Sequence, residues 1–322
     1  MAEQVTRALK VGLVLPLEGH ADEAIAHWND LKTMAQHAEA VGFDLLWLVD
    51  HLIYDFAAMA GVPDVPVWGV WECWSMLSAL AAVTTRVELG PLVACTSFRN
   101  PALLAKMADT TDEISGGRLI LGLGAGYHES EFRAFGYPFD HLVGRFEEAL
   151  RIIHSLLRTG AADLQGTYYN VRECELRPRG PRHGGPPILI GARQPRTRRL
   201  AARYADYWNG LGISDAANLA PTREAVDAAC AEVGRNPTTL ERSHFLAIDL
   251  PGGYERSYAT EVRQFRARYA PLSLETPEKL ANVIRAFALE GVGLIQLWPE
   301  PNNMASIDAL APVLQLLRQS PE

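Results

Sequence analysis

Apolar residues along the chain gather in two kinds of segment, and the two kinds alternate. The first kind is a short run that is nearly continuous in apolar residues, such as FDLLWLVD at 43–50. Continuous runs of this length are typical of strands that are covered on both faces. They predict strands over 10–17, 43–50, 86–95, 118–124, 186–192, 205–211, 244–250 and 292–298.

The second kind of segment repeats its apolar residues every three to four positions, as an amphipathic helix does. Within 28–41, for example, Leu31, Met34 and Ala38 follow this spacing, and Gly42 supplies a stop. The same pattern predicts helices over 28–41, 74–84, 101–115, 144–158, 195–205, 215–233, 277–290 and 303–318.

Strands that each lead into a helix predict an α/β protein with a (β/α)8 TIM barrel, and a doubly wound open sheet is the alternative. Long inserts at 51–72, 125–141 and 251–275 follow the second, fourth and seventh predicted strands. They therefore lie at the carboxyl ends of the strands, where barrel enzymes place their chemistry. No internal repeat or change of composition marks a second domain, so we expect residues 1–322 to form one domain.

Composition and charge narrow the function classes. Hydrophobic residues make up 48% of the chain and charged residues 21%, which is ordinary for a globular protein. A formal net charge of −8 argues against a partner that is nucleic acid or an anionic membrane surface. The chain has neither a signal-peptide pattern nor an apolar run of about 18 residues, so we expect a cytoplasmic protein. Its four cysteines are scattered, which predicts reduced thiols and no metal site.

Polar residues close the second and third predicted strands. Asp50 and His51 form an ionisable pair that suits a proton donor or a ligand contact, and the alternative is a loop cap with a surface histidine. After the third strand, Thr96 is small enough to let a flat ligand approach. Cys95 has no base beside it in the sequence, so a buried structural thiol is favoured over a nucleophile.

The stretch GGRLILGLGAGYHESEFRAFG at 116–136 follows a strand with three glycines and then a titratable cluster. Glycine permits close approach of a ligand to the backbone, although a tight turn needs it equally. The spacing is weak as a dinucleotide fingerprint. His128, Glu129 and Glu131 are candidates for acid, base or ligand contacts, with a solvated loop face as the alternative.

Two further segments carry candidate chemistry. Residues 191–197, GARQPRT, lead from the fifth strand into a helix, and the free N–H groups and arginines there predict a phosphate site, which Arg145 could also reach. The alternative is a solvated basic helix. In the first insert, Trp71 and its neighbours Trp68, Glu72 and Trp74 either wall an apolar pocket or pack beneath a long loop.

Taken together, these segments resemble the bacterial luciferase-like family, which contains flavin-dependent monooxygenases and deazaflavin (coenzyme F420) dependent oxidoreductases. The resemblance rests on FDLLWLVDHL, SALAAVTTRVELG, the 99–139 run that contains ISGGRLILGLGAGYHESEFRAFG, GRFEEALRII, GTYY and PPILIGARQPRTRRLAARYADYWN. These pieces occur in one order over the first two thirds of the chain, and the last third fits weakly.

The resemblance implies a (β/α)8 barrel that binds a flavin or deazaflavin ring at its carboxyl face. His51 matches a histidine implicated in catalysis, Arg145 an arginine that binds the cofactor phosphate, and Thr197 a phosphate contact. Gln194 stands where the family pattern has Ser, and Gly124 and Ala125 stand where luciferase has Cys and Arg, so luciferase chemistry is not carried over.

The expected site is therefore as follows. His51 and Glu131 are catalytic; Trp71, Glu72 and His128 contact substrate; and Asp50, Cys95, Thr96, Gly124, Ala125, Gly126, Tyr127, Arg145, Gly191, Ala192, Arg193, Gln194 and Thr197 bind the cofactor.

The favoured function is an oxidoreductase that transfers a hydride between coenzyme F420 and a small organic substrate. The sequence GAGYHESEFRAFGY resembles that of F420-dependent members and favours this cofactor. Six arginines could also attract the acidic F420 tail: Arg177, Arg179, Arg182, Arg193, Arg196 and Arg198. The alternative is an FMN-dependent monooxygenase, in which O2 would add at C4a of the flavin and one oxygen would pass to the substrate. A flavin-binding protein without turnover and a barrel lyase or hydrolase stay open. The resemblance also implies a homodimer.

Overall fold

The computed structural model describes residues 9–19, 25–60, 67–251 and 265–319, and its centre is a barrel of parallel strands. All eight predicted strand regions are confirmed. They are β1 (Lys10–Val14), β3 (Leu45–Leu48), β6 (Glu88–Pro91) with its continuation β7 (Ala94–Cys95), β8 (Leu121–Gly124), β11 (Ile188–Gly191), β12 (Tyr207–Leu211), β13 (Glu241–Asp249) and β15 (Leu294–Glu300).

The strand order closes the sheet on itself. Neighbours run β6-β3-β1-β15-β13-β12-β11-β8-β7, and β6 and β7 belong to one stretch of chain with a cis peptide bond between Leu92 and Val93. A parallel bridge from Leu89 to Leu119 joins the two ends. The fold is thus the predicted TIM barrel, and the doubly wound alternative is wrong.

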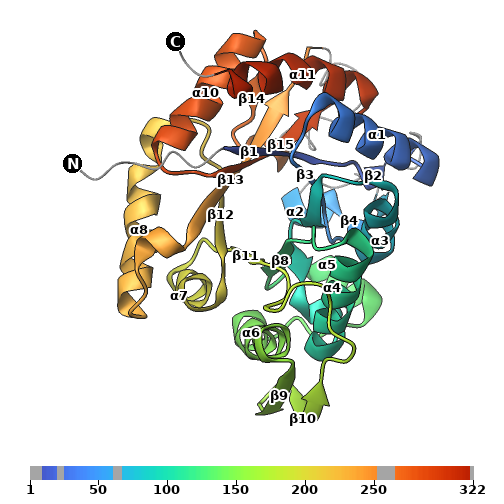
Figure 1. Cartoon of the computed structure of the whole chain (residues 1–322), viewed down its shortest axis with the longest axis vertical. Coiled ribbons are helices and arrows are strands. Elements are labelled where there is room, and N and C mark those ends of the chain that lie inside the picture. The colour runs from blue at the N-terminus through green and yellow to red at the C-terminus, as the bar shows by residue number, and fades with distance from the viewer. Residues whose placement is uncertain (1–8, 20–24, 61–66, 252–264, 320–322) are drawn as a thin grey trace.

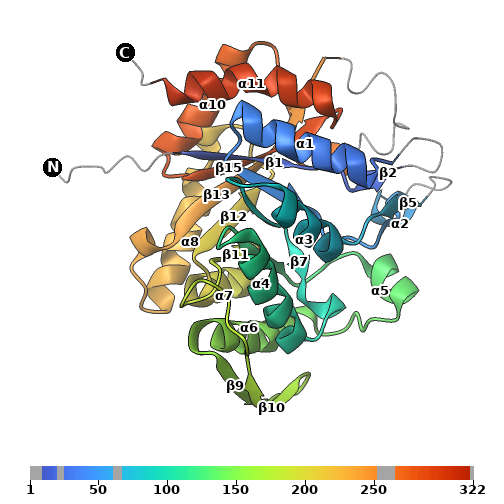
Figure 2. The ribbon, with the colours of Figure 1, turned by 45° about the vertical axis from the view of Figure 1, so that its right-hand side comes forward.

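Helices surround the barrel, as Figures 1 and 2 show, with α1, α10 and α11 together along one side and α4, α6, α7 and α8 along the others. All eight predicted helices are present: α1 (Trp28–Val41), α3 (Cys73–Val83), α4 (Pro101–Ser115), α6 (Leu142–Thr159), α7 (Pro195–Tyr204), α8 (Ala220–Glu232), α10 (Pro277–Leu289) and α11 (Met304–Arg318). No helix in the described part of the chain is long and apolar enough to cross a membrane.

The inserts carry small elements of their own. In the first, β4 (Ile53–Tyr54), α2 (Phe56–Ala60) and β5 (Trp68–Val70) join β2 (Glu18–Gly19) in an antiparallel sheet. The second insert forms α5 (Glu129–Phe135), and β14 (Leu272–Ser273) of the third pairs with β13. Residues 252–264 of the third insert lie outside the described residues. A hairpin of β9 (Ala161–Gln165) and β10 (Asn170–Glu175), which the sequence did not predict, follows α6.

Close backbone packing explains two glycines of the 116–136 stretch. A Cβ at Gly122 would lie 2.0 Å from the carbonyl oxygen of Pro91, and one at Gly124 would lie 2.7 Å from a methyl group of Val93. The space beside these glycines is therefore filled by the chain's own segment 91–93. On the Cβ side, packing within the protein explains why both residues are glycine, while Gly124 still lines the cavity described below.

Candidate functional site

A cavity of about 630 Å³ opens at the carboxyl ends of the barrel strands. It is lined by residues that follow β3, β8 and β11, so the three segments singled out in the sequence meet in one place. The predicted site residues that line it are Asp50, His51, Cys95, Gly124, Ala125, Gly126, Tyr127, His128, Glu131, Gly191, Arg193, Gln194 and Thr197.

Five predicted site residues do not line the cavity. Thr96 is fully buried, and its hydroxyl donates to the carbonyl of Gly124 at 3.3 Å. Ala192 is buried and accepts a hydrogen bond from the indole of Trp208. Arg145 is held by Asp140 at 2.7 Å beside the ring of Tyr168. The side chains of Thr96 and Arg145 are thus engaged by the protein itself, and Ala192 is buried outside the cavity.

The two substrate contacts predicted in the first insert also lie elsewhere. The Trp71 indole donates to the carbonyl of Ala26 at 2.9 Å. Glu72 caps α3 by accepting from the Ser75 amide at 2.6 Å, and its other oxygen accepts from Arg99. Both residues therefore fix the insert onto the barrel, and neither is among those that line the cavity.

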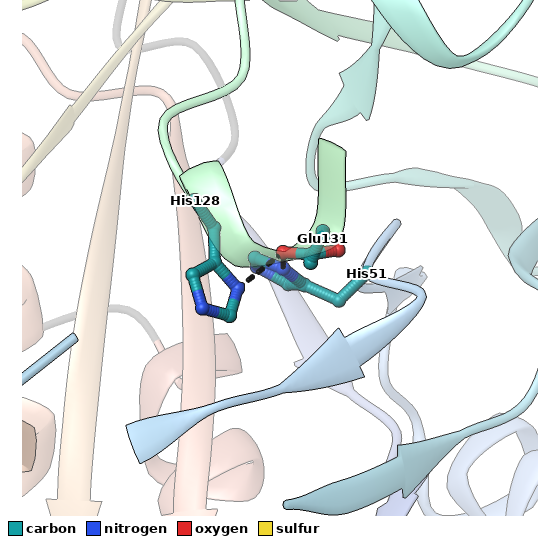
Figure 3. Close-up of side chains that lie close together, drawn as sticks. All are labelled: His51, His128 and Glu131. Atoms are coloured by element: carbon teal, nitrogen blue, oxygen red, sulfur yellow. Dashed lines mark hydrogen bonds and ion pairs between the residues drawn. The ribbon is translucent and has the colours of Figure 1, made fainter. Parts of the chain in front are cut away.

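A buried carboxylate joins two histidines at the cavity wall (Figure 3). Oε1 of Glu131 lies 2.6 Å from Nδ1 of His51 and 2.6 Å from Nδ1 of His128. Oε2 accepts a hydrogen bond from the Leu52 amide at 2.7 Å. The side chain of Glu131 is only 1% exposed, whereas that of His51 is 15% exposed and reaches the cavity.

These contacts set the protonation state of Glu131. Burial alone would raise the pKa of this carboxyl, but the hydrogen bonds from His128, His51 and Leu52 outweigh it and lower the pKa to about 2. Glu131 is therefore an anion at neutral pH, and both Nδ1 atoms donate to it. The remaining nitrogen of His51, Nε2, is left facing the Tyr127 hydroxyl at 3.4 Å.

Asp50 is engaged by a second buried ion pair. Arg99 donates to both of its oxygens, at 2.7 and 3.0 Å, and the Cys95 amide donates to Oδ2. Burial raises the pKa of Asp50, and the bidentate guanidinium opposes that shift. The carboxylate thus ties the end of β3 to the segment after β7, where it supports the wall on which His51 stands.

Cys95 is a buried thiol at the bottom of the same wall. Burial raises its pKa to about 12, so the thiolate is scarce at neutral pH. A Cβ at Gly126, whose φ is +80°, would lie 2.6 Å from its sulfur. The sulfur therefore packs against the turn that follows β8.

Another part of the cavity wall carries groups suited to a phosphate. Arg193, Gln194 and Thr197 line it where β11 leads into α7. The Thr197 hydroxyl donates to the carbonyl of Gln194 at 2.9 Å, which fixes the first turn of the helix. A helix of this length presents N–H groups and the positive end of its dipole to an anion.

Aromatic side chains that the sequence analysis missed form much of the remaining wall. They come from six separate segments of the chain and are Tyr54, Phe98, Phe132, Phe245, Phe265, Tyr269 and Trp298. Ring contacts link several of them, such as Phe245 to Trp298 at 5.6 Å and Tyr269 to Trp298 at 5.7 Å. They make much of the cavity wall apolar.

Comparison with known proteins decides the family. The model of the luciferase-like monooxygenase family matches residues 9–249.

The chain belongs to the luciferase-like monooxygenase family. It is accordingly an oxidoreductase, and the resemblance drawn from the sequence is confirmed. Curated relatives include pyrimidine monooxygenase RutA of Methylorubrum extorquens (strain PA1), 34% identical over 263 residues, which covers 73% of this chain and 65% of the relative. RutA of Stutzerimonas stutzeri (strain A1501) is 30% identical over 230 residues, 65% of this chain and 58% of the relative. The chain thus spans about three fifths of these relatives' length.

Solved structures share the fold of this luciferase-like chain. An F420-dependent secondary alcohol dehydrogenase superposes with a TM-score of 0.79 at 19% identity, covering 97% of this chain and 99% of its own. The long-chain alkane monooxygenase LadA superposes with a TM-score of 0.77 at 15% identity, covering 96% and 92%. At these identities the likeness concerns the fold alone.

The position of the arginines bears on the cofactor of this luciferase-like protein. Arg182 binds Asp112 at the end of α4 and the carbonyl of Leu119 before β8, and Arg179 donates to the carbonyl of Leu157 at the end of α6. Both arginines therefore lie at the amino ends of the strands, opposite the cavity. The prediction that they attract an acidic F420 tail is wrong, because they are on the far side of the barrel.

Proposed function

We propose that this chain is a monooxygenase that binds reduced FMN in the cavity and uses O2 to oxygenate a planar organic substrate. The proposal rests mainly on one observation: the carboxylate-bound His51 faces the same cavity as Arg193 and Thr197, where β11 leads into α7. The names of the 30–34% identical relatives support oxygenation and make a pyrimidine-like heterocycle the first substrate class to test. Because the chain spans only part of those relatives, their activity enters as a proposal.

The residues present suit this cofactor. The cavity volume of about 630 Å³ is within the range of cofactor sites, and its walls combine polar and aromatic side chains. Arg193, Gln194 and Thr197 would hold the phosphate, and the backbone from Gly124 to Tyr127 would flank the ribityl chain. When bound, reduced flavin supplies two electrons and activates O2, so that one oxygen atom enters the substrate and the other leaves as water.

The chain's own residues supply orientation and a proton path. Nε2 of His51 is the nitrogen that Glu131 leaves free, and it is placed to exchange a proton with a substrate in the cavity. Glu131 has both oxygens occupied, so we assign it the role of orienting His51 instead of the predicted direct proton transfer. The aromatic rings of Phe245 and Trp298 would pack against a flat substrate and exclude water.

Charge near the outer edge of the cavity also favours FMN over F420. Val143 lines both the cavity and a neighbouring hollow, and we take this hollow as the way out for a long cofactor tail. The charged groups that line this hollow balance, two acidic against two basic: Glu147, Glu148, Arg151 and Arg196. Since Arg196 is paired with Glu147 at 2.7 Å, the hollow offers little net attraction to an oligoglutamate tail.

An anaerobic titration with FMN and with F420, in oxidised and reduced forms, tests this proposal. We expect quenched flavin fluorescence and tighter binding of FMN than of F420. Admission of ¹⁸O2 to the reduced complex with a panel of pyrimidines should then place one ¹⁸O in the product. Binding of F420 alone, with hydride transfer under anaerobic conditions, would establish the F420 oxidoreductase instead. Binding without turnover would indicate a carrier, and binding of neither cofactor would indicate a lyase or hydrolase.

A further inference from the structure

His128 holds a place at the site that the proposed function does not use. It lines the cavity, and the sequence predicted a substrate contact. Both of its ring nitrogens are already engaged, Nδ1 by Oε1 of Glu131 and Nε2 by the hydroxyl of Ser130, each at 2.6 Å. Its side chain is 4% exposed. A substrate would therefore find no free nitrogen on His128.

The unusual feature is that His51 and His128 share one carboxylate oxygen (Figure 3). An ionised carboxylate accepts several hydrogen bonds, but each donor on the same oxygen withdraws some of the charge that the other donor feels. The Ser130 hydroxyl lies 2.6 Å from Nε2 of His128; with Nδ1 donating to Glu131, this hydroxyl is placed to donate to Nε2 and to hold the ring proton on Nδ1. His128 is thus positioned as a donor to the oxygen that orients His51.

We propose that His128 is a positioning residue for His51, and that its hydrogen bond to Oε1 of Glu131 weakens the hold of this carboxylate on the His51 proton. The inference rests on the proposed role of His51 in proton transfer. Its consequence is that His51 releases its proton more readily than a histidine with a carboxylate to itself. Ser130 contributes by holding the His128 tautomer.

Other groups face His51 but are not bonded to Nδ1. The Tyr54 ring of β4 lies 4.3 Å from its ring at a tilt, and the Tyr127 hydroxyl approaches Nε2. Glu18 of β2 interacts with His51 through its charge, and the neighbouring Asp50 is paired with Arg99. His128 also meets the His51 ring edge-on at 6.2 Å and the Tyr127 ring at 6.4 Å. A change at His128 can thus reach His51 through Glu131 or through these ring contacts, and variants that keep only the donor or only the ring separate the two routes.

Two variants separate the hydrogen bond from the rest of the side chain. His128→Asn keeps an N–H donor at the position of Nδ1, whereas His128→Phe keeps a ring of similar size without the donor. The titration midpoint of His51 is followed by ¹H–¹³C NMR of its imidazole, and the pH profile of kcat/KM by turnover. For His128→Phe we expect both midpoints to rise by about one pH unit, as loss of one hydrogen bond to a charged group predicts. For His128→Asn we expect a midpoint close to wild type.

The outcomes are distinct. Unchanged midpoints in His128→Phe would overturn the proposal, and so would an equal rise in both variants, since His128 would then act through its own charge. Ser130→Ala, which keeps the imidazole, should give a smaller rise and serves if His128→Phe does not fold. His37→Asn removes a histidine 2.6 Å from Asp308 on the outer helices and should leave His51 unchanged. The NMR readout needs no substrate, so it stands even if the monooxygenase proposal fails.

Discussion

Replacing Glu131 with glutamine changes the charge of this residue while keeping its shape, and it tests the reasoning about the site most directly. In the wild type, Oε1 accepts from two imidazoles and Oε2 from the Leu52 amide. In Glu131→Gln, one terminal atom becomes an NH2 group. Whichever way the amide turns, that group faces a hydrogen-bond donor, so at least one contact becomes repulsive.

The magnitude follows from the pKa of Glu131, which the site lowers from 4.5 to about 2. A shift of this size corresponds to about 3 kcal/mol of free energy of unfolding. Because the pKa is lower in the folded protein, this stability is fully present above pH 4.5 and is lost as the pH falls toward 2. We therefore expect Glu131→Gln to be about 3 kcal/mol less stable at pH 7, with a gap that narrows below pH 4.5.

Urea unfolding of both proteins at pH 7, 5 and 3.5 measures this difference. Glu232→Gln is the matched control, because it removes a carboxylate that is paired with Arg199 but 55% exposed, and its effect should stay below about 0.5 kcal/mol. Turnover of Glu131→Gln should fall by about 10²-fold, with FMN affinity retained, because His51 loses its orienting anion. Equal stability at pH 7, or a gap that stays constant down to pH 3.5, would refute the assignment of a buried anion.

Three further predictions concern the walls of the cavity. Arg99→Met leaves Asp50 buried without its partner, and it should lower the free energy of unfolding by about 3–5 kcal/mol in urea titrations. A loss of stability below about 1 kcal/mol would contradict the ion pair. Cys95, with a pKa of about 12, should resist iodoacetamide at pH 8 in the folded protein, as followed by mass spectrometry, and rapid alkylation would show that it is not buried. Arg193→Ala should weaken FMN binding by about 10-fold in fluorescence titrations. Arg177→Ala should leave FMN binding unchanged, because the Arg177 side chain pairs with Glu175 on the hairpin. Equal effects of the two variants would place the phosphate elsewhere.

The barrel could be predicted from the sequence because its strands are buried on both faces and its helices on one. The bounds of α1 and α4 agree with the prediction to the residue, since Gly42 and Gly116 end them in the left-handed conformation. The hairpin of β9 and β10 was missed because its residues are largely polar and exposed, which leaves little apolar pattern to detect.

The site was predictable only in part. The sequence placed His51, Gly124 and Thr197 at strand ends, and the cavity brings them together. It named Glu131 and not its exposed neighbour Glu129, but the physical reason, the way the short helix α5 turns Glu131 inward, is visible only in the structure. The aromatic wall also escaped prediction, since its rings converge from segments far apart in the chain.

The packing of segment 91–93 against Gly122 and Gly124 has a consequence for how the pocket can diversify. With no side chain at these two positions, the neighbouring segment lies close, and Leu92 and Val93 both line the cavity. Even an alanine at position 122, which is not among the residues that line the cavity, would require that segment to move. Because Leu92 and Val93 would move with it, a substitution outside the cavity can reshape the cavity while His51 and Glu131 keep their own contacts.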